Sequence, residues 1–149
     1  MDNDARSAVV AALLGLAGSS DYRDRADAGQ ALAVLAERPE TTQPLLRLLL
    51  DPDDTFVTAA TAAALLRRAD EIGLAAVAHA LAGADDNHAD WLYTAVQNEF
   101  SVYESHRDAA VRTCDALIDN ADPSSRNGLT VLRDMLTAID PILHSARED

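Results

Sequence analysis

The sequence predicts an all-α fold, an α-α superhelix of about four helical pairs. Apolar positions recur at spacings of 32 and 33 residues, as at Leu13, Leu46 and Ala78. Alanine, the strongest helix former, dominates these stretches, whereas aromatic residues make up only 4% of the chain. No run of alternating β-branched residues competes with helix. Repetition at this period is typical of stacked helical pairs, because no single pair buries its apolar face alone.

The first repeat is expected at residues 4–38, and an apolar stripe predicts its first helix at about residues 4–17. Ser20 or Asp21 can cap the second helix, since a short side-chain oxygen accepts hydrogen bonds from the free amides of the first turn. This helix is expected to reach Glu37 and to stop at Arg38-Pro39, because proline disfavours helical backbone in the residue before it.

The second repeat contains the most apolar segment of the chain, a leucine-rich helix. Pro44 is tolerated in the first turn of this helix, where its missing amide is not needed. Asp51-Pro52 ends the helix, and Asp53 or Asp54 can cap the next one. The two helices are expected at about residues 41–50 and 54–68, within a repeat of residues 41–69.

The second half of the chain predicts four more helices. Asp85-Asp86 forms the acidic turn of the third repeat, and a turn at residues 120–123 divides the fourth. Asp140-Pro141 breaks the last helix before an amphipathic tail that contains Ile142 and Leu143. The helices are expected at about residues 71–82, 86–103, 106–119 and 123–139, in repeats 70–104 and 105–139 followed by a tail, residues 140–149. All four repeats are expected to form one domain, residues 1–149.

The charge of the chain is strongly acidic. It has 25 acidic residues against 12 basic ones, a net charge of −13. Neutralisation of phosphates dominates nucleic-acid binding, so a nucleic-acid partner is not expected. The acidity favours a basic protein partner, although it also fits the solubility of an exposed surface. All the basic residues are arginine, a bias that together with the alanine excess is typical of a high-GC bacterial genome.

Cysteine usage and hydropathy predict a cytoplasmic protein without a membrane partner. Cys114 is the single cysteine, so no intrachain disulfide forms. The apolar segment at residues 8–18 follows acidic rather than basic residues and is shorter than a membrane span.

The first two repeats share a leucine-rich first helix, an acidic turn and an alanine-rich second helix. The residues that carry this pattern are Pro44-Leu45-Leu46, Leu49, Asp51-Pro52-Asp53, Val57, Ala62 and Ala64-Leu65 in the second repeat, and Asp21, Arg25, Ala28 and Ala31-Leu32 in the first. This pattern resembles the HEAT repeats, with Asp24 and Thr58 standing where that family has valine and arginine. The resemblance implies a HEAT-like solenoid, right-handed, with the second helices on its concave side. It implies no common chemistry.

The third repeat departs from this pattern and contains the candidate functional residues. Four of the six aromatic residues of the chain lie between Trp91 and Tyr103. Helical spacing places Leu92 and Val96 on one face, which is the natural core, and Tyr93 and Gln97 on another. The expected partner-binding residues are Asp90, Trp91, Tyr93, Gln97, Phe100 and Glu104. Trp91 and Phe100 are expected to be buried, partly buried or anchoring.

Three interpretations of this cluster remain open. The aromatic side chains fill space in the core, or they anchor a partner, or the cluster holds a metal or acid–base site from His88, Asp90, Glu104 and His106. His88 and His106 would lie about 27 Å apart at the ends of a continuous helix, too far for one metal ion. The sequence has no CxxC, HExxH or phosphate-binding glycine loop, so no metal or cofactor is expected. Cys114 lies on an apolar helix face and is expected to be a buried small side chain.

The favoured function is a non-catalytic protein–protein interaction module that binds through the concave face and the acidic and aromatic patch of the third repeat. An alternative is an acidic inhibitor or immunity-type protein that neutralises a basic toxin or nuclease. A third is an enzyme of the lyase or hydrolase kind that depends on His88 or Asp90.

Overall fold

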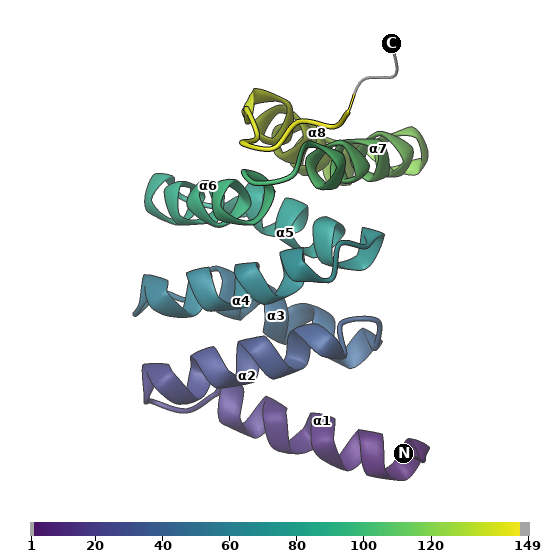
Figure 1. Cartoon of the computed structure of the whole chain (residues 1–149). Helices are drawn as coiled ribbons and strands as arrows, with labels where there is room; N and C mark the ends of the chain where they lie inside the picture. The colour runs from purple at the N-terminus through teal and green to yellow at the C-terminus, as the bar shows by residue number, and fades with distance from the viewer. Residues whose placement is uncertain (1, 147–149) are drawn as a thin grey trace.

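The computed structural model describes residues 2–146 and confirms the all-α prediction, with eight α-helices in this range (Figure 1). Residues 147–149 of the expected tail lie outside it. The helices are α1 (Asn3–Ala17), α2 (Tyr22–Val34), α3 (Thr42–Leu49), α4 (Thr55–Arg67), α5 (Glu71–Gly83), α6 (Asp86–Phe100), α7 (Glu104–Asn120) and α8 (Pro123–Ala138), and a short 3-10 helix, η1 (Pro39–Thr41), precedes α3.

Two helix ends differ from the prediction. α2 ends at Val34 rather than near Glu37, because the amides of Leu35 and Ala36 bond carbonyls three residues back and tighten the chain into a turn. α6 ends at Phe100 rather than at Tyr103. Tyr103 is extended, with φ −106° and ψ 122°, and starts α7 two residues earlier than expected.

Aspartates start most of the helices and explain part of the acidity. Six of the eight α-helices have an aspartate N-cap whose carboxylate accepts a hydrogen bond from an amide of the first turn. These residues are Asp2, Asp21, Asp54, Asp70, Asp85 and Asp122. A negative charge at this place also interacts favourably with the helix dipole.

The second helices of the first three pairs pack directly on one another. α2 packs against α4, and α4 packs against α6, while the first helices α1, α3 and α5 touch one another less. Figure 1 shows the pairs following one another in chain order from the N-terminal end to the C-terminal end. The core between the two sets of helices is made mainly of leucine and alanine, with Phe100 as its largest fully buried side chain.

The last helix breaks this order. α8 packs mainly on α5 and α7 and only lightly on α6. Gly128 lies against the carbonyl oxygen of Ala78 in α5, so closely that a Cβ at this position would overlap with that oxygen. The missing side chain therefore allows the backbones of α5 and α8 to approach closely.

Two buried threonines of α4 have hydroxyl groups with unsatisfied hydrogen-bonding capacity. Thr58 and Thr61 are fully buried, and among the described residues neither hydroxyl has a hydrogen-bond partner. Thr61 packs against Gly29 of α2, where a Cβ on the glycine would overlap with the threonine side chain. The backbones of α2 and α4 therefore lie close together. The two threonine hydroxyl groups lose their contact with water without gaining a hydrogen bond, which costs stability at this interface.

We expect Gly128→Ala to lower the free energy of unfolding by about 1–3 kcal/mol, because the new Cβ forces α8 away from α5. Gly15→Ala is the matched control, since a Cβ on Gly15 meets no atom within 4 Å. This change should stabilise α1 by up to about 1 kcal/mol, the helix-propensity difference between the two residues. Urea unfolding of both variants makes the comparison. Equal effects would contradict the close packing of α5 and α8.

We expect Thr58→Val to raise the free energy of unfolding by about 1 kcal/mol, because valine fills the same space without a buried unsatisfied hydroxyl. Thr94→Val is the control: its hydroxyl is exposed and already donates to the carbonyl of Asp90. Thermal unfolding monitored by circular dichroism measures both. A Thr58→Val variant less stable than the parent would show that the hydroxyl is satisfied.

Candidate functional site

The predicted residues of α6 lie mostly on its surface. Asp90 and Gln97 are exposed, and Trp91 and Tyr93 are 42% and 38% exposed. The amide of Gln97 donates a hydrogen bond of 2.6 Å to the hydroxyl of Tyr93. Trp91 and Tyr93 are two residues apart and therefore point to different sides of the helix. The structure thus separates the two aromatic residues that the sequence placed in one cluster.

Phe100 belongs to the core and not to the surface. It is fully buried, and its ring lies 4.7 Å from the ring of His106, measured between centroids. Phe100 is therefore removed from the predicted partner contacts. Glu104, the first residue of α7, is partly exposed, and its carboxylate lies 2.7 Å from Nδ1 of His144.

Tyr93 is exposed because the next second helix does not cover it. It is the eighth residue after the N-cap of α6, and the equivalent residues of α2 and α4 are Gly29 and Ala62. Both of these small residues are buried, and Gly29 lies under Thr61 of the following second helix. α8 packs on α5 instead of continuing this order, so a large side chain is accommodated at Tyr93.

The C-terminal tail extends the exposed surface beside α6. Leu143 forms a parallel β-bridge with Tyr103, and the amide of Ile142 donates to the carbonyl of Ser101 at 2.9 Å. Ile142 is 74% exposed and Leu143 50%. The sequence predicted an amphipathic tail but not its docking, because the bridge joins two single residues that are forty positions apart and leave no strand pattern in the sequence.

We call the exposed and partly exposed residues of α6, of the start of α7 and of the docked tail the C-terminal patch. Along α6 the positions 90, 93, 97 and 101 follow one another at spacings of three and four residues and so share one side of the helix. Ser101 at the end of this row binds the tail. The patch consists of Asp90, Tyr93, Gln97, Tyr103, Glu104, Ile142 and Leu143.

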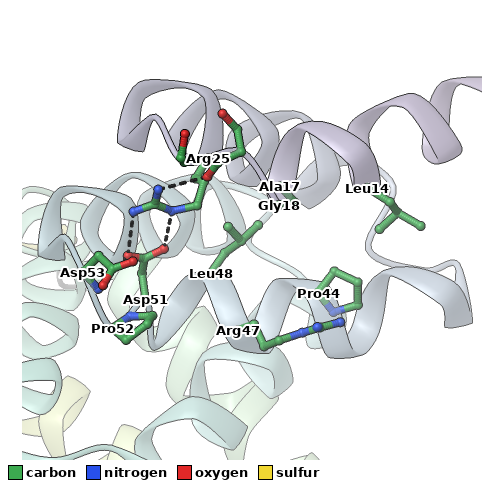
Figure 2. A pocket seen from close by; sticks show the side chains of 12 residues that line it. Leu14, Ala17, Gly18, Arg25, Pro44, Arg47, Leu48, Asp51, Pro52 and Asp53 are labelled. Carbon is green, nitrogen blue, oxygen red and sulfur yellow. Dashed lines mark hydrogen bonds and ion pairs between the residues drawn. The ribbon is translucent and has the colours of Figure 1, made fainter.

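A second cluster of polar groups lies at the turns between helices. Arg25 of α2 donates from Nε to Asp51 Oδ2 at 2.8 Å and from Nη2 to Oδ1 at 3.1 Å, and both side chains are buried. Figure 2 shows the Arg25 guanidinium between Asp51 and the turn after α1, where it also donates to the carbonyl of Ser19. Burial alone would raise the pKa of Asp51, but hydrogen bonds from Arg25 and from the amides of Asp54 and Asp53 outweigh it and lower this pKa below 3.8.

His88 joins this cluster to the third repeat. Its Nε2 lies 2.7 Å from the carbonyl oxygen of Asp51, and its Nδ1 lies 2.8 Å from Oδ1 of Asp85. The hydrogen bond with the Asp51 carbonyl is the main reason why the pKa of His88 is raised, and the contact with Asp85 adds to it against the effect of burial. His88 therefore has a structural environment that the sequence did not predict.

The described residues do not bring His88 and His106 together in one metal site. His88 is bound at the Asp51 turn and His106 packs on Phe100, so the two rings face different surroundings. Between residues 2 and 146 no three histidine, cysteine, aspartate or glutamate side chains are grouped closely enough to hold a metal ion. Burial raises the pKa of the Cys114 thiol to about 11, so this thiol is protonated at neutral pH.

Two cavities lie elsewhere on the fold. Arg25 and Asp51 line one of about 530 Å³ between α1, α3 and the turn that follows α3 (Figure 2). The other, of about 940 Å³, has a mainly apolar lining from α3 and α5 and reaches the first turn of α8. None of the predicted partner-binding residues lines either cavity.

Comparisons with known proteins give no relative. No family model, no curated protein and no solved structure matches this chain. Of the helices in the described part of the chain, none has the length and apolar character needed to cross a membrane.

We expect Arg25→Met to lower the free energy of unfolding by about 3 kcal/mol or more, because it leaves the buried Asp51 carboxylate without its cation. Arg23→Met is the matched control, two residues away on the same helix. Arg23 also pairs with an aspartate, Asp21, but both side chains are exposed, so stability should hardly change. Urea unfolding at neutral pH compares them. Similar losses in both variants would contradict a special role of the buried pair.

Proposed function

We propose that this chain is a cytoplasmic HEAT-like α-solenoid that acts as a non-catalytic protein-binding module. Three observations support the architecture: the repeat of 32 to 33 residues, the Asp51-Pro52-Asp53 turn of the HEAT-like pattern, and the direct packing of α2 on α4 and of α4 on α6. Stacked helical pairs of this kind expose extended surfaces suited to binding other proteins.

The observation that carries the proposal is the exposure of Tyr93. At the equivalent positions of the two preceding second helices the small residues Gly29 and Ala62 are buried, and Gly29 lies against Thr61 of the next second helix, whereas Tyr93 is 38% exposed. The tail adds Ile142 and Leu143, which are at least half exposed. Large apolar and aromatic side chains that a fold leaves exposed are candidates for an interaction site, and tyrosine is frequent among the residues that dominate binding energy.

Charge indicates the kind of partner. The C-terminal patch contains the carboxylates of Asp90 and Glu104, and Asp140 lies beside the docked tail, 3.6 Å from His144 Nε2. With a net charge of −13, the chain attracts a basic protein and orients its approach. Exposed apolar side chains together with carboxylates suit a protein interface, in which apolar contacts hold the partner and charges orient its approach. Trp91 lies on another side of α6 and is not included in the patch.

The same charge supports a second candidate, an inhibitor or immunity-type protein that occupies the cationic groove of one toxin or nuclease. Here electrostatic attraction would contribute more to the association, which would then weaken strongly as salt is raised. A module with several looser partners depends more on the apolar residues of the patch. Salt dependence therefore separates the two candidates.

We expect the double variant Tyr93→Ala and Glu104→Ala to capture at least roughly thirtyfold less partner from a lysate of the source organism, as loss of central contact residues does at other interfaces. The matched control is Tyr22→Ala with Glu71→Ala, which removes an equally exposed tyrosine and an exposed glutamate elsewhere. Captured proteins are quantified by mass spectrometry at low and high salt, and melting is recorded for every variant.

Full capture by a folded double variant would reject the C-terminal patch as the binding site. One partner, lost at high salt, would favour the inhibitor. Several partners that persist would favour the general binding module.

A further inference from the structure

His88 links two turns that belong to different helical pairs. It is the third residue of α6, and its side chain is only 12% exposed. One ring nitrogen lies against the backbone carbonyl of Asp51, in the turn between α3 and α4, and the other lies against the carboxylate of Asp85, the N-cap of α6. Both contacts, at 2.7 and 2.8 Å, have the length of strong hydrogen bonds.

Both partners of the ring are acceptors. A carbonyl oxygen has no proton to donate, so Nε2 must carry a hydrogen. Asp85 is ionised at neutral pH, because the hydrogen bond from the backbone amide of His88 and the contact with its ring hold the pKa of Asp85 below 3.8. Nδ1 must therefore carry a hydrogen as well. A neutral imidazole has one N–H, so it would leave one of the two contacts with two lone pairs facing each other.

The charged groups around His88 agree with a cationic ring. Asp85 and Asp51 attract it from the two turns. The carboxylate of Asp51 is itself bound by Arg25 of α2 and by two amides of its own turn, so the positive charge of Arg25 is compensated where the turns meet. Asp53 and Asp54 in the Asp51 turn, and Asp86 and Asp90 on α6, add further negative charge.

We propose that His88 is an imidazolium at neutral pH that clamps the first turn of α6 to the Asp51 turn, and that its deprotonation loosens α6 from the preceding helical pair. The packing of α6 on the preceding helical pair is therefore sensitive to pH. This sensitivity depends on two hydrogen bonds from one ring and needs no partner or ligand.

The direction of the pH dependence follows from the two acceptors. The pKa of His88 is raised above its ordinary value of 6.5, chiefly by the hydrogen bond with the Asp51 carbonyl. Its contribution to stability is then complete below pH 6.5 and is lost as the pH rises through the raised pKa. On the acid side, the contribution of Asp85 is lost only when the pH falls from 3.8 through its lowered pKa.

The test is a pH titration of the four histidines by ¹H–¹⁵N NMR in the whole 149-residue chain. We expect both ring nitrogens of His88 to be protonated at pH 6.5, with a midpoint displaced upward from the ordinary value of 6.5. Asp85→Asn keeps a good N-cap but removes the carboxylate, so it should move the His88 midpoint down. Amide hydrogen exchange in the first turns of α6, corrected for intrinsic rates, should accelerate as the pH passes the His88 midpoint.

His88→Gln completes the test, because glutamine retains one donor and does not titrate. Its amide protection in α6 and its unfolding free energy should vary less with pH above 6.5 than those of the parent, whereas His79→Gln should behave as the parent does. A His88 ring with a single protonated nitrogen and a midpoint at or below 6.5 would overturn the proposal. So would a His88→Gln variant with the pH dependence of the parent.

Discussion

The buried pair of Arg25 and Asp51 is the interaction on which the arrangement of the repeats depends. Asp51 accepts four hydrogen bonds, two from the Arg25 guanidinium and two from the amides of Asp53 and Asp54. Arg25 also holds the carbonyl of Ser19, and the carbonyl of Asp51 binds His88. The turns after α1, α3 and α5 are thereby tied into one polar chain that crosses three helical pairs. Burial of these charges is costly, and the four hydrogen bonds to Asp51 and the three from Arg25 offset this cost.

This polar chain ends at His88, and the regular order of the second helices ends soon after it. Beyond α6 the fold is stabilised differently: Gly128 brings α8 onto α5, and the tail pairs with the connection between α6 and α7. The side of α6 that would meet a fourth second helix is left partly open. Tyr93 lies at this side, which is why the proposed contact surface and the irregular packing of α8 have one physical origin.

The sequence predicted the helices well because their signals are local. Aspartates at N-caps and prolines after helix ends mark boundaries through the first-turn amides and the backbone restrictions of proline. The Arg25 and Asp51 positions were also recognisable, since both belong to the HEAT-like pattern of the first two repeats. Their pairing across 26 residues was not predicted, because a helical period does not state which polar groups meet.

The candidate site was predicted only in part. Tyr93 and Phe100 are seven residues apart and share one face of α6, yet one is exposed and the other is fully buried. Helical periodicity predicts the face of α6 on which a side chain lies. It does not predict how far along that face a neighbouring helix packs. The exposure of Tyr93 depends on where α8 and the tail lie, and long-range contacts at Gly128 and Leu143 set these positions.

The most direct test of the polar chain is a double-mutant cycle between Arg25→Met and His88→Gln, measured by urea unfolding near pH 6.5. These residues lie on α2 and α6, and within residues 2–146 Asp51 is the one hydrogen-bond partner that both side chains have, Arg25 through the carboxylate and His88 through the carbonyl. If Asp51 joins the three turns into one unit, the coupling energy should be at least about 0.5 kcal/mol. If the effects of the two substitutions on the free energy of unfolding add within about 0.3 kcal/mol, the turns are independent, which would contradict a single polar chain.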